Sequence, residues 1–226
     1  MRLVLLLVGV MLSARSAADG IWWTGKLQLS DLAQLPQRLN APFEDKIPVS
    51  KGSRSAVAGN CADYLLYVPQ GFEPASDMEG RVLRSWGVDC DALKALEHVR
   101  AAKRSFLKGF VLNASALRSL PPEMSTSLSN DAAESAKRAD AEGLSWAAFR
   151  RGAKAEQQGD KLVIADGSTR TTLEIYARGD FNGDGLEDLL VRDDSSVVRG
   201  TYTDSRLFVL TRRSPAGRLS IVVLGG

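Results

Sequence analysis

The chain has little of what most catalytic metal sites and nucleophilic triads need. It holds two cysteines and one histidine in 226 residues. A zinc site or a nucleophile activated by histidine would therefore have to be built around His98. No nucleophile-elbow motif accompanies it. This scarcity argues against zinc enzymes and against hydrolases with a Ser-His-Asp triad.

Long hydrophobic runs are also missing, apart from one at the start of the chain. Arg2 precedes an apolar run over residues 3–12, and small residues at 16–18 offer a cleavage site, so we predict a signal peptide over residues 1–18. The run is shorter than the ~20 residues that span a bilayer. No cysteine follows it, so no lipoprotein anchor is expected. We expect a periplasmic or secreted protein without a membrane span.

The chain lacks an excess of charge of either sign. It carries 29 basic and 27 acidic residues, and Arg2 and Arg15 fall within the predicted signal peptide. The remainder therefore has 27 of each. A near-neutral surface argues against nucleic acid or an anionic membrane as partner.

Cys61 and Cys90 are the only cysteines. In an oxidising compartment they are expected to form a disulfide, and the alternative is two separate buried thiols. Closing a loop of this length would stabilise the fold by ~3–4 kcal/mol on the chain-entropy model.

Helical patterns dominate the first part of the chain. Ser76 and Glu79 fit a capping box that opens a helix, which Gly87 is expected to break. A further helix is expected over residues 131–142. The composition of residues 41–58 is typical of a long connection. The hydrophilic run over residues 153–160 is typical of a hinge.

After Gly159 the pattern becomes extended. Strand character recurs over residues 161–165, 171–177, 188–192, 206–211 and 219–224. The predicted fold class is α+β, with an N-terminal helical part packed on a C-terminal antiparallel β-meander of four or five strands. We expect the helical part over residues 19–158 and the β part over residues 159–226.

One loop carries the strongest functional signal. Oxygen-bearing side chains recur at Asp180, Asn182, Asp184 and Asp188, with a glycine at the sixth position. Ca²⁺ prefers six to eight oxygen ligands, and a glycine there permits the sharp turn of a calcium loop. The spacing predicts that these four side chains bind Ca²⁺.

Residues 179–188 resemble the calcium loop of FG-GAP and related integrin-type repeats, in which an acidic loop joins adjacent strands. The resemblance implies that Leu186 supplies its backbone carbonyl to the metal. A single copy cannot form a propeller, which needs several blades. Val191 stands where an EF-hand has its bidentate glutamate, which argues against an EF-hand.

The alternative for this loop is a metal-free hairpin, because Asn-Gly and Asp-Gly are both good turn dipeptides. That alternative does not account for oxygen ligands in register. We expect a structural rather than catalytic role for the calcium ion, since neither an open coordination position nor a neighbouring acid or base is evident.

Two other motifs have simpler explanations. Ser105 and Lys108 match the Ser-x-x-Lys of penicillin-recognising enzymes, but the companion motifs are absent. Arg178, Gly179 and Asp180 spell an adhesion tripeptide, yet Asp180 is better used as the first metal ligand. Trp22 and Trp23 form an apolar group that is expected to be buried, with an exposed recognition patch as the alternative.

The leading functional hypothesis is an exported, calcium-stabilised, non-enzymatic binding or structural module of the bacterial cell envelope, with a protein or glycan partner. A first alternative is an extracytoplasmic hydrolase that uses carboxylates such as Glu174, Glu187 or Asp193 on cell-wall or carbohydrate material. A second is a periplasmic protein inhibitor with a protruding loop over residues 41–58. The sequence names neither the partner nor the oligomeric state.

Overall fold

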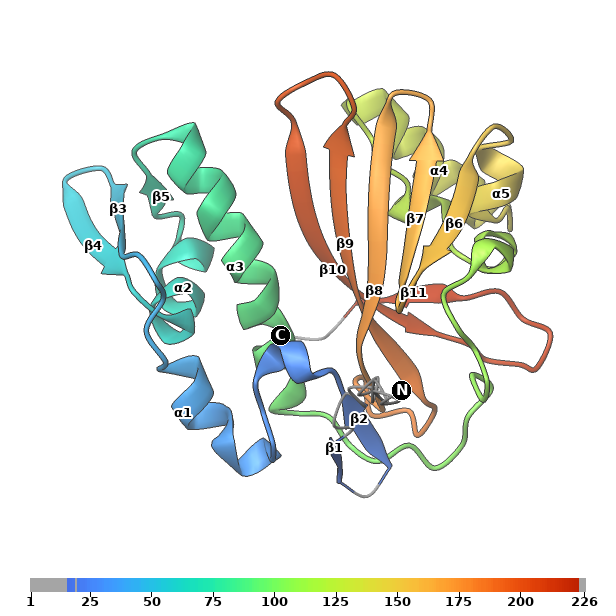
Figure 1. Cartoon of the computed structure of the whole chain (residues 1–226), viewed down its shortest axis with the longest axis horizontal. Helices are drawn as coiled ribbons and strands as arrows, with labels where there is room; N and C mark the ends of the chain where they lie inside the picture. The colour runs from blue at the N-terminus through green and yellow to red at the C-terminus, as the bar shows by residue number, and fades with distance from the viewer. Residues whose placement is uncertain (1–15, 19, 224–226) are drawn as a thin grey trace, which may run out of the picture.

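The fold is described from a computed structural model that covers residues 16–18 and 20–223. Figure 1 shows two parts lying side by side, a small mixed part at the left and a large twisted antiparallel sheet at the right. The long helix α3 (Asp77–Leu96) stands between them, against one side of the sheet. This helix packs on β10 (Thr203–Thr211).

The small part combines helices with a second sheet. Its three strands run in the order β4-β3-β5, and all its pairings are antiparallel. Besides α3, the elements are α1 (Leu35–Leu39), α2 (Cys61–Tyr67), β3 (Ile47–Lys51), β4 (Arg54–Ala58) and β5 (Glu73–Pro74). The predicted disulfide between Cys61 and Cys90 is confirmed and ties α2 to α3. The predicted capping box at Ser76 and Glu79 is also present and begins α3.

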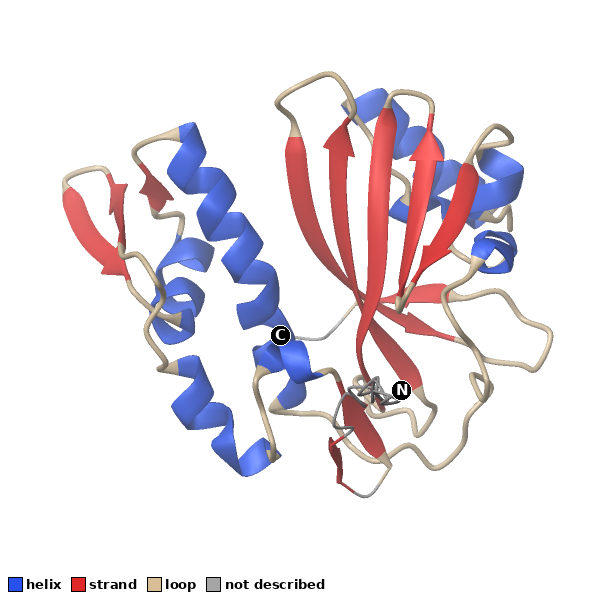
Figure 2. Cartoon of the chain, in the orientation of Figure 1, coloured by secondary structure: helices blue, strands red, loops and turns tan. Residues whose placement is uncertain are grey.

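Figure 2 shows the large sheet in red with helices behind it. Along its main path the strand order is β1-β2-β8-β9-β10-β11, and β6 and β7 extend it beside β8. The strands are β1 (Ser16–Ala18), β2 (Ile21–Trp23), β6 (Lys154–Gln158), β7 (Lys161–Asp166), β8 (Thr169–Gly179), β9 (Asp188–Val197), β10 and β11 (Ser220–Val222). One edge of β8 pairs with β7 through residue 174 and with β2 at residues 177–178.

Both faces of this sheet are covered. Leu189 and Val191 belong to one core cluster, while Leu190 between them belongs to another. The first cluster lies under the segment that carries α4 (Asn130–Ala141) and α5 (Trp146–Phe149), and includes Trp146. The second lies under α3. Burial on both faces explains the continuous apolar run at the start of β9, since alternating polarity is expected only when one face meets water.

The predicted fold class is wrong. Among the described residues the large sheet has eight strands rather than four or five, and two of them, β1 and β2, come from the start of the chain. The N-terminal part is not simply helical either, because it contains the sheet of β3, β4 and β5. The predicted boundary between residues 158 and 159 lies at the turn between β6 and β7.

Three local predictions fail for identifiable reasons. The expected connection over residues 41–58 contains the hairpin of β3 and β4, which turns at Gly52. The expected hinge over residues 153–160 contains β6, whose polar residues are mostly exposed on a strand that pairs on one side only. Gly87 does not end a helix; it lies inside α3. In each case tertiary pairing or packing decides the structure over local composition.

Candidate functional site

The predicted calcium loop joins the two longest strands of the sheet. Gly179 ends β8, Asp188 begins β9, and these two residues face each other in antiparallel register. The loop therefore lies at one end of a strand pair that is hydrogen-bonded along most of its length. Its two ends are fixed by the sheet.

Asp180 organises the first half of the loop. Its Oδ1 accepts a hydrogen bond from the backbone N–H of Gly183 at 2.7 Å, and its Oδ2 accepts one from the N–H of Gly185 at 2.9 Å. Both glycines have positive φ, +80° and +83°. Residues other than glycine rarely adopt that backbone conformation, so these two glycines let the backbone curl around the Asp180 carboxylate.

Asn182 and Asp184 continue the same pattern on the outer side of the loop. Asn182 Oδ1 accepts from the N–H of Asp184 at 2.9 Å, and Asp184 Oδ1 accepts from the N–H of Leu186 at 2.8 Å. Both side chains are exposed. The carbonyl oxygen of Leu186 accepts no hydrogen bond from the part of the chain that the structure describes. A carboxylate oxygen with one N–H partner keeps a lone pair for a second one.

Asp188 closes the loop from below. Its side chain is fully buried, and its Oδ2 accepts a hydrogen bond from the N–H of Phe181 at 3.1 Å. Its Oδ1 is buried and makes no hydrogen bond of normal geometry among the described residues, although the buried hydroxyl of Thr211, opposite Asp188 in β10, is close enough to act on this carboxyl. Burial, with smaller contributions from the charges of Asp184 and Asp180, raises the pKa of this carboxyl to about 6, although the Thr211 hydroxyl and the hydrogen bond from the N–H of Phe181 lower it. An unpartnered buried carboxylate oxygen is costly unless something outside the chain pairs with it.

A neighbouring segment holds the loop by its backbone. Arg100 exchanges two backbone hydrogen bonds with Asp180, at 3.0 and 2.8 Å. The N–H groups of Lys103 and Arg104 both donate to the carbonyl of Gly185, at 2.9 and 3.1 Å. We call residues 99–105 the strap. It connects the end of α3 to the loop, so the loop is fixed to the helix as well as to the sheet.

Of the three carboxylates named for a hydrolase, Glu187 lies beside this strap. It accepts a hydrogen bond from the hydroxyl of Ser105, and Arg178 lies 3.8 Å away. Ser105 lies outside any helix, so it shares no helical face with Lys108. The Ser-x-x-Lys spacing therefore has no catalytic geometry here.

The other two carboxylates point to opposite faces of the sheet. Glu174 is opposite Arg192 in the register of β8 and β9, and its carboxylate binds Lys26 at 2.5 Å. Asp193 is the next residue along β9, so its side chain points to the other face. It is fully buried and binds Arg206 at 2.7 Å. These carboxylates share no cleft.

A hydroxyl cluster surrounds Asp193. Ser195 donates to its Oδ1 at 2.7 Å, and the hydroxyls of Thr171 and Thr126 lie within 3.1 Å of the Ser195 hydroxyl. Burial raises the pKa of Asp193 to about 6, although the charge of Arg206 and the hydrogen bond from Ser195 lower it. The cluster is buried and satisfies a charged core residue.

The aromatic pair near the start of the chain is mostly interior. Trp23 is 1% exposed, and its indole N–H donates to the carbonyl of Leu29 at 3.0 Å. Trp22 is half-buried in the same strand. Burial is confirmed for Trp23, so the pair does not form an exposed recognition patch. His98 is exposed just after the end of α3.

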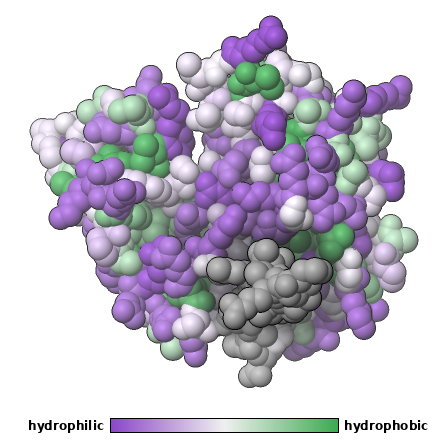
Figure 3. Space-filling model, viewed as in Figure 1, coloured by the Kyte–Doolittle hydropathy of each residue, from purple (hydrophilic) through white to green (hydrophobic). Residues whose placement is uncertain are grey.

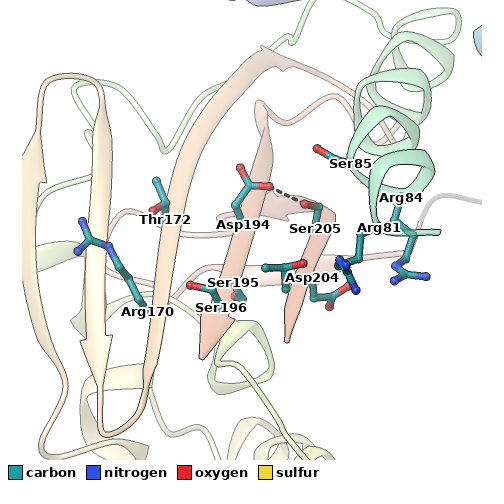
Figure 4. Close-up of a pocket in the computed structure, with 11 residues that line it drawn as sticks. Arg81, Arg84, Ser85, Arg170, Thr172, Asp194, Ser195, Ser196, Asp204 and Ser205 are labelled. Carbon is teal, nitrogen blue, oxygen red and sulfur yellow. Dashed lines mark hydrogen bonds between the residues drawn. The ribbon is translucent and has the colours of Figure 1, made fainter. Parts of the chain in front are cut away.

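A polar groove between α3 and the sheet was not predicted from the sequence. Figure 4 shows its lining, to which α3 contributes Ser85 and Arg81, while strands β8, β9 and β10 contribute residues such as Thr172, Asp194 and Ser205. Its volume is about 330 Å³. Residues of three strands meet one helix here, and no local motif marks such a long-range arrangement.

No helix in the described part of the chain is long and apolar enough to cross a membrane. Within residues 16–18 and 20–223, no three histidine, cysteine, aspartate or glutamate side chains are grouped so that they could hold a metal ion, and this includes Asp180, Asp184 and Asp188. The predicted calcium set also includes an amide and a backbone carbonyl. The predicted signal peptide falls almost entirely on residues outside this part, although residues 16–18 form β1. The chain matches no known family model, no curated protein and no solved structure.

Proposed function

We propose that this protein is a calcium-stabilised, non-enzymatic binding module that is exported to the bacterial cell envelope. The loop of residues 180–188 would hold a structural Ca²⁺ ion. Its side-chain ligands would be Asp180, Asn182, Asp184 and Asp188, and Leu186 would provide a backbone carbonyl. A protein or glycan of the envelope would be the partner.

One observation carries the calcium proposal. Asp188 buries an oxygen that makes no hydrogen bond of normal geometry in the described chain, and its charge interacts with those of Asp180 and Asp184. Three carboxylates in so short a loop repel one another. A divalent cation would satisfy the orphan oxygen and remove the repulsion together. A metal-free hairpin would leave the repulsion in place, with the Thr211 hydroxyl as the nearby donor for this oxygen.

The ion is expected to stabilise the contacts among β8, β9 and the strap. The loop begins at the end of β8, finishes at the start of β9 and is hydrogen-bonded to the strap. An ion that binds only the folded loop would stabilise all three by mass action. The proposed role of the ion is therefore structural, and no reaction is assigned to it.

Export is supported by a sequence pattern and by the disulfide. The pattern over residues 1–18 is that of a signal peptide, and the Cys61–Cys90 disulfide suits an oxidising compartment. Extracellular and periplasmic calcium is available to a weak site, as in other extracellular modules.

Thermal unfolding in calcium and in chelator tests the proposal, with the disulfide intact. Calcium at about 100 times its Kd would add about 2.7 kcal/mol, which raises Tm by roughly 5–10 °C for a chain of this size. Magnesium serves as the ion control. Calorimetric titration with CaCl₂ should give one site per chain.

Asp184→Asn makes the test two-sided. It keeps the side-chain oxygen that accepts the Leu186 N–H but removes one of the three charges. We expect the variant to be more stable than wild type in chelator and to respond less to calcium. Asp160→Asn, at an exposed carboxylate in the turn after β6, should change neither value. Equal Tm values for wild type in calcium and in chelator would reject the calcium site.

A further inference from the structure

Every residue that lines the groove between α3 and the sheet is polar or charged. Hydroxyls come from Ser85, Thr172, Ser196, Thr203 and Ser205, and no aromatic or large aliphatic side chain contributes. The face of the molecule seen in Figure 3 is mostly hydrophilic, and its apolar residues are scattered. Apolar and aromatic side chains dominate sites for apolar ligands. This groove therefore suits a small polar ligand rich in hydroxyl groups.

The floor of the groove is held by Arg192. Its Nε donates to both oxygens of Asp194, at 3.0 and 2.8 Å, and its two terminal nitrogens reach Asp89 at 2.7 Å and Ser85 at 3.1 Å. Ser205 also donates to Asp194, at 2.7 Å, the bond drawn in Figure 4. These bonds join α3, β9 and β10 across the floor. A site that is fixed in this way loses little entropy when a ligand binds.

Three arginines that line the groove have no such partners. Arg81 and Arg84 come from α3, and Arg170 comes from β8 on the opposite side (Figure 4). The guanidinium of Arg84 lies near Gly80 rather than over the strands. None of the three arginines makes an ion pair or a side-chain hydrogen bond within the described residues. In Figure 4 Arg81 extends from the helix toward the strands. Arg81 is therefore the cation best placed to meet a ligand.

The charges of the lining favour an anionic group. Arg81 and Arg170 line the groove together with Asp194, whose carboxylate is already neutralised by Arg192 from below. A second lining carboxylate, Asp204, lies 3.8 Å from Arg206. Arginine binds carboxylate and phosphate through paired N–H groups, while the remaining hydroxyls and carboxylates can bind the hydroxyls of a sugar.

We propose that this groove binds a small hydroxylated molecule that carries a carboxylate or phosphate, such as a sugar acid or a sugar phosphate. The inference rests on the proposed binding function and gives it a ligand class and a place. It does not require the calcium ion, because none of the groove residues belongs to the loop of residues 180–188.

Three probes that share one ring test the proposal: glucose, glucuronate and glucose 6-phosphate. Each is titrated into the whole exported protein in excess calcium, and binding is followed by calorimetry and by NMR shifts of groove amides. We expect glucuronate, glucose 6-phosphate or both to bind and glucose to bind at least about tenfold more weakly, since a charge-assisted hydrogen bond contributes ~1.5–3 kcal/mol. Which acid binds more tightly distinguishes the carboxylate from the phosphate source.

Arg81→Gln and Arg170→Gln should each weaken binding of the charged probe about tenfold or more. The matched control is Arg118→Gln, at an exposed arginine outside the groove. Equal affinity in Arg81→Gln, Arg170→Gln and Arg118→Gln would overturn the proposal, as would the absence of binding by both charged probes. If a charged probe binds but calcium does not raise Tm, the groove proposal stands and only the calcium site is rejected.

Discussion

The ring of Tyr64 on α2 lies directly against the backbone of Gly87 on α3. A Cβ atom at residue 87 would come within 2.5 Å of the ring atom Cε2 and would overlap Cζ and Oη as well. Gly87 is buried in the middle of a helix of 20 residues. Glycine normally weakens a helix, so its presence here is explained by the space that the tyrosine ring needs.

Gly87→Ala is therefore expected to destabilise the protein by about 1–3 kcal/mol, as overpacking does. Gly80→Ala, in the first part of the same helix, is the matched control. A Cβ at residue 80 meets only the tip of Arg84 at 3.4 Å and Pro74 at 3.6 Å. This second variant should gain roughly 0.5–1 kcal/mol from helix propensity. Urea unfolding measures both, and a gain for both variants would contradict the packing role of Gly87.

The disulfide between Cys61 and Cys90 encloses a sequence separation of 29 residues. Replacing both cysteines by alanine should cost ~3–4 kcal/mol, mostly because the unfolded chain gains freedom. The comparison of the oxidised wild type with the double variant in urea provides the measurement. A loss below about 1 kcal/mol would show that the contacts between α2 and α3 restrain these segments without the covalent link.

Asp91 on α3 gives the protein a pH dependence with a definite sign. Burial raises the pKa of this carboxyl to about 6, although a hydrogen bond from Tyr64 lowers it. The folded state thus holds the proton more tightly than the unfolded chain, where an aspartate titrates near 3.8. Stability from this group is greatest at low pH and falls as pH rises through about 6.

Asp91→Asn removes this titration. The unfolding free energy of the variant minus that of wild type should rise between about pH 4 and pH 7 and then level off. In Tyr64→Phe the loss of stability with rising pH should occur at higher pH than in wild type, because the hydrogen bond that lowers the pKa of Asp91 is absent. Taking differences cancels the other acids that titrate in the same range. A flat difference across this range would refute the assignment to Asp91.

Local features were predictable from the sequence where a few neighbouring residues decide the structure. The capping box at Ser76 and the strand positions on either side of residues 180–188 depend on short-range patterns, and both occur. The disulfide was predictable because only two cysteines exist. These predictions needed no knowledge of which segments meet in space.

Long-range pairing was not predictable in the same way. Trp22 pairs with Arg178, far along the chain, and this pairing adds β2 to the large sheet. No local sequence pattern in either segment predicts that the two segments pair. The groove has the same origin, since Arg81 and Asp194 meet only after α3 packs on the sheet. Likewise the low helix propensity of Gly87 predicts a break, but its packing against Tyr64 explains why a glycine lies inside α3.

Gly179 controls how closely the strap approaches the calcium loop. A Cβ atom there would come within 2.5 Å of Cγ2 of Val99 and 3.3 Å of the carbonyl oxygen of Arg100. Arg100 is the residue that exchanges two backbone hydrogen bonds with Asp180. Only glycine allows the strap to lie against the end of β8 at this distance.

Gly179→Ala should therefore push the strap away from the loop. We expect a loss of about 1–3 kcal/mol in chelator from the steric contact, and a weaker response to calcium because Asp180 loses its backbone support. Gly152→Ala is the control, since a Cβ at that position meets nothing within 4 Å. Urea unfolding in chelator and calcium titration separate the two effects. A loss of stability with unchanged calcium affinity would show that the ligands are positioned by the sheet alone, because Asp180 and Asp188 would then keep their geometry without the strap.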